Sequence, residues 1–138
     1  MCLEFLIIFF VTFNRYKYPL EDFVRENKAE DDRCLATVEE QIEKQTKAGV
    51  PVAGIVIEPI QAEGGDNHAS KEFFQGLDRI AHKYDISLLM DEVQTGGGST
   101  GKMWCHEHFD LEHGPGEVDT IEDRYICPFL MIKYVFQI

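Results

Sequence analysis

Residues 52–60 read VAGIVIEPI, a short and nearly continuous apolar run that is rich in β-branched side chains. Such a run is typical of a strand that is buried on both faces, as in a parallel sheet. Pro59 lacks the amide hydrogen that a sheet ladder needs, so the strand is expected to end there. The next residues, QAEGGDNHA at 61–69, are rich in turn formers and predict a loop. The stretch therefore predicts an α/β fold built on a parallel strand.

A helix and a second strand are expected after this loop. Residues 71–85 (KEFFQGLDRIAHKYD) carry one apolar stripe at helical spacing, and Ser70 is suited to cap the helix. Residues 86–90 (ISLLM) then predict a second buried strand. Upstream, residues 19–48 have near-helical apolar spacing, and the GVP that follows supplies a stop signal. The sequence thus predicts a helix followed by a βαβ unit, whose crossover is almost always right-handed.

The composition argues against several classes of function. The chain of 138 residues has 25 acidic residues against 13 lysines and arginines, a formal net charge of −12. Such a charge repels nucleic acids and anionic membranes. The 4 cysteines form no C-x-x-C pair, which indicates neither a zinc ribbon nor a compact disulfide framework. We therefore expect a single domain in a reducing compartment.

Both ends of the chain are apolar. The start, MCLEFLIIFFVTF, contains Glu4 and is shorter than the roughly 20 residues of a membrane-spanning helix. It also lacks the basic region and cleavage site of a secretory signal peptide, so a strand or a stray translated segment is expected. The other end, RYICPFLMIKYVFQI, is equally apolar. Two such ends on an acidic middle predict a piece of a larger protein.

Acidic and amide side chains follow both predicted strands. Glu58 and Glu63 come after the first strand, and Asp91, Glu92 and Gln94 come after the second. The carboxyl ends of parallel strands emerge at one edge of a sheet, where α/β proteins bind ligands. A carboxylate at the end of a buried strand needs a cation or hydrogen-bond donors, so at least one of these acids should have a defined positive partner. The alternative is that the acids are solvated or cap a nearby helix.

Two further motifs suggest other chemistry. Residues 96–102 have the G-x-x-x-x-G-K spacing of a phosphate-binding loop, but Met103 stands where Ser or Thr would bind magnesium. A nucleotide-binding module is therefore a weak alternative. A metal site is another, although the spacing is loose and the H-E-x-x-H motif is absent. Its candidate ligands are Cys105, His106, His108 and His113.

The sequences around the strand ends resemble a known family. E-P-I-Q-x-E-G-G followed by D-E-V-Q-T-G resembles the class III pyridoxal-phosphate-dependent aminotransferases, over residues 15–111. D-N-H-A-S and G-G-G-x-T-G-K-x-W-x-H-E-H narrow the resemblance to members that transfer the amino group of 4-aminobutyrate to 2-oxoglutarate. The resemblance implies part of the large domain of the fold-type I transferases, a homodimer in the full enzyme and a location in the mitochondrial matrix. It sets apart residues 1–14 as an apolar segment outside the family and 112–138 as a divergent apolar tail.

The resemblance also implies roles for individual residues. Asp91 would pair with the protonated ring nitrogen of pyridoxal phosphate, and Gln94 would hydrogen-bond the phenolic oxygen of the ring. Glu63 would pair with a substrate-site arginine and release it when a dicarboxylate enters. Glu58 and Pro59 would shape the strand end without direct chemistry. The glycine run would be a close-packed turn that leads away from the site.

The chain departs from the family where the lysine that forms the Schiff base is expected. Asp123 stands near that position, and the surroundings of Lys133, the only later lysine, do not match. We therefore expect an aminotransferase fragment that is inactive alone. A non-catalytic protein that pairs with a full-length aminotransferase subunit is the alternative.

Overall fold

The computed structural model describes residues 7–10, 16–62 and 65–113. Its main sheet has three strands in the order β1-β2-β5. These are β1 (Ile7–Phe10), β2 (Val52–Ile57) and β5 (Ser87–Met90). Both neighbouring pairs are parallel, which confirms the predicted α/β class and parallel sheet.

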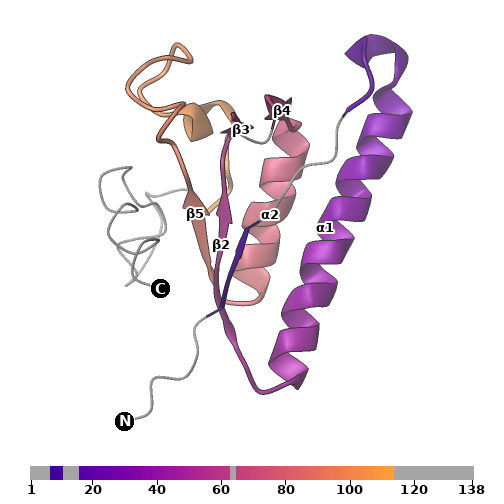
Figure 1. Ribbon diagram of the computed structural model, residues 1–138, viewed down its shortest axis with the longest axis vertical. Coiled ribbons are helices and arrows are strands. Elements are labelled where there is room, and N and C mark those ends of the chain that lie inside the picture. The colour runs from indigo at the N-terminus through magenta and orange to yellow at the C-terminus, as the bar shows by residue number, and fades with distance from the viewer. Residues whose placement is uncertain (1–6, 11–15, 63–64, 114–138) are drawn as a thin grey trace.

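Two helices lie side by side against this sheet (Figure 1). One side of β2 and of β5 contributes to the core between helices and sheet, where Ile55 pairs in register with Leu88, and Ile57 with Met90. Val56 and Leu89, which also pair in register, are buried as well. β2 and β5 are thus buried and apolar on both faces, as their sequences predicted.

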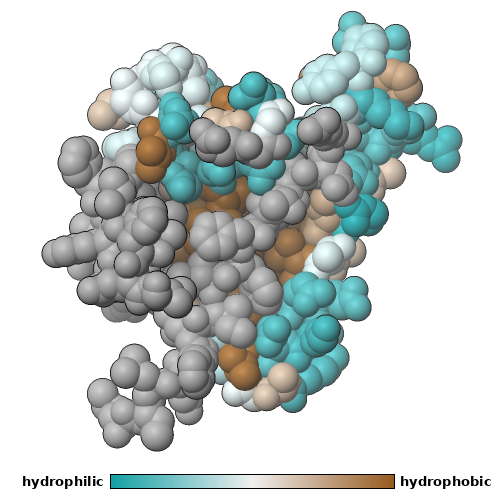
Figure 2. All heavy atoms as spheres, viewed as in Figure 1, coloured by the Kyte–Doolittle hydropathy of each residue, from teal (hydrophilic) through white to brown (hydrophobic). Residues whose placement is uncertain are grey.

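The first helix, α1 (Val24–Lys47), follows a short 3-10 helix, η1 (Leu20–Asp22). Together they fill most of the predicted helical region. α1 ends where Gly49 takes a φ of 77°, a left-handed conformation that suits glycine after a helix. Its outward surface is mostly hydrophilic (Figure 2), and no described helix is both long and apolar enough to span a bilayer.

The second helix, α2 (Lys71–Lys83), begins at the predicted cap. The Oγ of Ser70 accepts the N–H of Phe73 at 3.0 Å, which satisfies one of the free amides of the first turn. Gly76 lets α2 approach α1 closely, because a Cβ at this position would lie 2.5 Å from Cδ1 of Leu35. The helix ends two residues earlier than predicted, and Asp85 turns the chain toward β5 with a φ of 54°.

The strand predicted in the apolar run 52–60 was expected to end at Pro59, and the observed strand ends two residues before that proline. β2 stops at Ile57, because Pro59 cannot donate to a ladder, and the chain resumes as β3 (Ile60–Gln61). β3 pairs antiparallel with β4 (Asn67–His68), inside the stretch predicted to be a loop. The predicted domain boundaries near residues 14 and 111 stay predictions. Within the first segment, residues 7–10 form the expected strand, whereas the tail from residue 114 lies outside the described residues.

Candidate functional site

Asp91 extends the sheet at the carboxyl end of β5. Its N–H donates to the carbonyl of Ile57 at 2.8 Å, so the backbone of Asp91 continues the ladder between β2 and β5. Its Oδ1 accepts the N–H of Val93 at 3.1 Å. Within the described part of the chain, Oδ2 has no hydrogen-bond partner, and the side chain is partly exposed. The turn therefore holds Oδ1 of the Asp91 carboxylate, and Oδ2 has no partner among the described residues.

The other predicted site residues have different outcomes. Gln94 is exposed, in the turn that follows Asp91. Glu58 is partly buried, and its Oε2 accepts the N–H of Ala62 at 3.2 Å, in line with a role in shaping the strand end. Glu63, Asp123 and Lys133 lie outside the described residues. The structure thus brings Asp91 and Gln94 to one end of the sheet and leaves the role of Glu63 a prediction.

Glu92 is the acid that the protein buries, with 3% of its surface exposed. Four donors meet its carboxylate: the Oγ1–H of Thr95 at 3.1 Å, the N–H of Cys105 at 2.6 Å, the N–H of His106 at 2.9 Å and the ring Nδ1 of His106 at 2.7 Å. Burial raises the pKa of Glu92, but the bonds from His106 and Cys105 outweigh it and hold the pKa below its usual value. These donors satisfy the buried carboxylate of Glu92, whereas a positively charged partner for one of the acids at this edge stays a prediction.

The sequence alone assigned no role to Glu92. The alternation of side chains after a buried strand indicates that Asp91 and Glu92 point to opposite sides, but not which of them is buried. The deciding donors, Cys105 and His106, lie 13 and 14 residues further along the chain.

The glycine run packs as a closed turn. Three of its amides bind carbonyls of the same loop: Gly96 N–H donates to Glu92, Gly98 N–H to Met103 and Gly101 N–H to Gly98. A Cβ on Gly96 would lie 2.7 Å from Cζ3 of Trp104, so this turn needs glycine for close packing. The Nζ of Lys102 donates to the carbonyl of Glu107. The loop therefore uses for itself the groups that would cradle a phosphate, which agrees with a structural turn.

The cysteine and histidines that suggested a metal site bind other partners. His106 binds Glu92, and the Nε2 of His108 lies 3.1 Å from the carbonyl of Thr100. His113 binds the buried Asp78 through its N–H and its Nδ1, at 2.9 and 3.1 Å. Across residues 7–10, 16–62 and 65–113, no three potential ligands gather in a way that could hold a metal ion.

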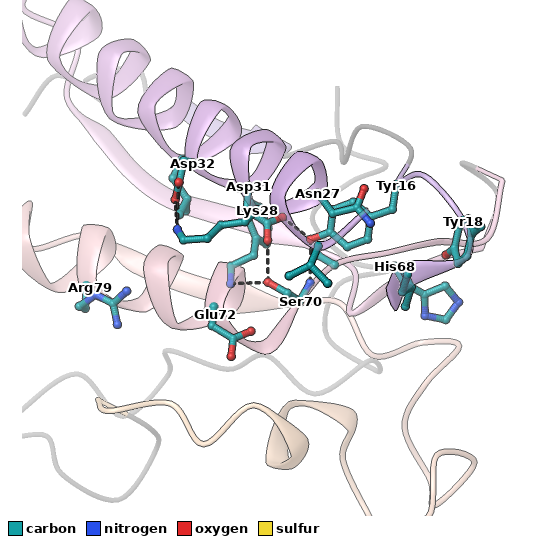
Figure 3. A pocket seen from close by; sticks show the side chains of 15 residues that line it. Tyr16, Tyr18, Asn27, Lys28, Asp31, Asp32, His68, Ser70, Glu72 and Arg79 are labelled. Atoms are coloured by element: carbon teal, nitrogen blue, oxygen red, sulfur yellow. Dashed lines mark hydrogen bonds and ion pairs between the residues drawn. The ribbon is translucent and has the colours of Figure 1, made fainter. Parts of the chain in front are cut away.

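A cavity of about 860 Å³ lies elsewhere, between the first turns of α1 and α2. Its wall is built on a polar junction (Figure 3): Tyr16 donates to Oδ1 of Asp31, and the Oγ–H of Ser70 donates to Oδ2 at 2.7 Å. The Tyr16 oxygen also accepts the N–H of Ser70 at 2.9 Å. Burial and the bond to Asp31 raise the pKa of Tyr16. Neither Asp91 nor Gln94 lines this cavity, so the strand-end site is separate from it.

Comparison with known proteins gives these residues a context. Residues 4–114 match the sequence model described as aminotransferase class-III, a match that takes in most of the segment before residue 15. Over 125 residues, or 91% of this chain, the sequence is 55% identical to "4-aminobutyrate aminotransferase, mitochondrial" of Sus scrofa. It is 57% identical over 110 residues to 4-aminobutyrate aminotransferase of Kluyveromyces lactis, covering 80% of this chain. The chain spans only about a quarter of the length of these relatives.

Solved structures of aminotransferases have the same fold. Lysine aminotransferase from M. tuberculosis superposes with a TM-score of 0.57 and 36% identity, over 61% of this chain and 19% of that one. Ornithine aminotransferase from Plasmodium yoelii gives a TM-score of 0.50 and 36% identity, over 56% of this chain and 19% of that one. The described residues are therefore part of a fold-type I domain, and the chain belongs to the class III aminotransferases.

Proposed function

We propose that this chain is the cofactor-facing part of a 4-aminobutyrate aminotransferase. The observation that carries the proposal is Asp91 itself, in a stretch that matches 4-aminobutyrate aminotransferases: its backbone is held by the β2–β5 ladder, its Oδ1 is bonded to Val93, and its Oδ2 has no partner among the described residues. The full enzyme would transfer the amino group of 4-aminobutyrate to 2-oxoglutarate.

Asp91 fits pyridoxal phosphate in charge and position. A carboxylate beside the pyridine nitrogen favours the protonated form of that nitrogen. Asp91 is partly exposed, and its Oδ2 would accept the hydrogen bond of the ring N–H. When bound, the cofactor supplies an electron sink for the substrate carbanion. Gln94 would donate to the phenolic oxygen of the ring. Glu63 would pair with a substrate arginine and release it for a dicarboxylate.

The remaining parts of the enzyme would come from outside the described residues. The lysine that bonds the cofactor has no counterpart near Asp123 in the printed sequence, so the chain alone should be inactive. The full enzyme would be a homodimer in the mitochondrial matrix. In support, the mammalian relatives carry "mitochondrial" in their names, whereas those from Dictyostelium discoideum and Saccharomyces cerevisiae do not.

A chimera tests the proposal. Residues 16–113 of this chain would replace the corresponding stretch of the Sus scrofa enzyme. We expect the chimera to transaminate 4-aminobutyrate, and Asp91→Asn to lower kcat at least a hundredfold, because the neutral amide no longer stabilises the ring cation. Asp85→Asn is the matched control, since Asp85 is exposed and its φ of 54° suits asparagine. An Asp91→Asn chimera as active as the unsubstituted chimera would exclude the proposed role.

The isolated chain gives a second test. Pyridoxal phosphate and borohydride should leave no adduct at one defined lysine of the purified 138-residue protein. A single mapped site would contradict its inactivity.

A further inference from the structure

Glu92 fastens a distant segment of the chain to the end of β5. Its carboxylate takes the N–H groups of Cys105 and His106 at 2.6 and 2.9 Å, at the start of the 3-10 helix η2 (Cys105–His108). Hydrogen bonds to a buried ionised group are the strong ones, and removing the charge leaves several donors unsatisfied. The Glu92 side chain therefore bonds the segment at 105–106 to the end of the strand.

The same residue closes the turn that carries Gln94. The carbonyl of Glu92 accepts the N–H of Gly96 at 2.9 Å, and its carboxylate accepts the hydroxyl of Thr95 at 3.1 Å. Gln94 lies in the chain between Glu92 and the two residues that Glu92 binds, Thr95 and Gly96. Trp104 packs against Gly96, so the turn also rests on the segment that Glu92 fastens.

Asp91 lies between two buried neighbours. Met90 on one side and Glu92 on the other are 2% and 3% exposed, whereas Asp91 is partly exposed. The ladder bond to Ile57 fixes Asp91 from the amino side, and the anchoring of Glu92 fixes it from the carboxyl side. Its Oδ1 is bonded to Val93, which belongs to the same turn.

We propose that Glu92 is a positioning residue for Asp91 and Gln94, which it holds by anchoring the 92–96 turn to the segment at 104–106. This inference rests on the proposed function for its catalytic meaning. The bonds of Glu92 to Thr95, Cys105 and His106 lie within the chain, so the positioning itself can be measured without cofactor. The proposed effect of Glu92 on Asp91 and Gln94 acts through the turn.

Amide hydrogen exchange in the full 138-residue chain, without cofactor, tests the proposal. Glu92→Gln keeps the size of the side chain. Its amide NH2 replaces one carboxylate oxygen and would face N–H groups that need an acceptor. We expect exchange at the Gly96 and Asp91 amides to accelerate at least tenfold, while the amides inside β2 and β5 stay protected. Glu112→Gln, at an exposed glutamate, should change none of these rates.

Two results would overturn the proposal. One is faster exchange at Cys105 and His106 with unchanged rates at Gly96 and Asp91. The other is uniform acceleration at all amides, which would make Glu92 a general stabiliser.

If Glu92→Gln does not fold, acid titration of the wild-type chain replaces it. The Gly96 amide should then shift with the same midpoint as the carboxyl carbon of Glu92, and separate midpoints would refute the positioning role. Neither the exchange experiment nor the titration uses pyridoxal phosphate. An inactive chimera would therefore count against the proposed function, and unchanged exchange rates would count against the positioning role of Glu92.

Discussion

His106 contacts one oxygen of Glu92 twice, through its backbone N–H at 2.9 Å and its ring Nδ1 at 2.7 Å. A carboxylate oxygen only accepts, so Nδ1 carries a hydrogen in this arrangement. The pair joins the end of β5 to η2 in the buried part of the site.

This pair makes stability depend on pH in the acid range. The folded-state pKa of Glu92 lies below its ordinary 4.5, so the contribution of Glu92 is fully present above pH 4.5 and is lost as pH falls through the folded pKa. We expect the difference in free energy of unfolding between wild type and Glu92→Gln to narrow from pH 6 to pH 3. Urea denaturation at several pH values measures it. Glu112→Gln should show no such narrowing, and a constant difference for Glu92→Gln would contradict the prediction.

The Tyr16 junction should be sensitive to the loss of one oxygen. Asp31 is buried, with 9% of its surface exposed. Tyr16→Phe removes the hydroxyl that donates to Asp31 and accepts from the Ser70 amide. Unsatisfied buried groups of this kind cost about 1–3 kcal/mol, so the free energy of unfolding should fall by about that amount. Tyr18→Phe, at a tyrosine that is 62% exposed, is the control. Equal stability of the two variants in urea would show that the junction contributes nothing.

The sequence predicted those parts of the fold that depend on near neighbours. The apolar runs at residues 52–60 and 86–90 predicted two buried parallel strands, and the Ser70 cap precedes its helix by one residue. The resemblance to class III aminotransferases led to the prediction that Asp91 and Gln94 bind the cofactor. The anchoring of Glu92 and the Tyr16 junction were not predictable, because their partners are distant: Tyr16 and Ser70 are 54 residues apart. The periodicity of apolar residues in a helix or strand carries no information about pairs that are so far apart in the sequence.

The contact between α1 and α2 should show coupling between Gly76 and Leu35. Gly76→Ala raises helix propensity by about 1 kcal/mol, but its Cβ would meet Leu35 atoms at 2.5 and 2.9 Å. We expect Gly76→Ala to destabilise the wild-type chain by about 1–3 kcal/mol through this overpacking. In a Leu35→Ala background the same change should be neutral or stabilising. A double-mutant cycle in urea measures the coupling, and additive effects would show that Leu35 moves aside freely.

Phe109 should hold the segment after η2 against α2. Its ring stacks on Phe74 with centroids 3.9 Å apart, and its carbonyl accepts from Nε2 of Gln75 at 3.0 Å. Phe109→Ala removes this buried ring, and full core truncations of phenylalanine cost about 3–5 kcal/mol. Because Phe109 directly follows η2, which carries Cys105 and His106, loss of its ring should also loosen η2, expose Glu92 and accelerate exchange at the Gly96 amide. Met103→Ala, at a side chain that is 59% exposed, should change stability by less than about 0.5 kcal/mol. If Phe109→Ala lowers stability while exchange at Gly96 keeps its wild-type rate, the stack supports α2 without supporting the strand-end site.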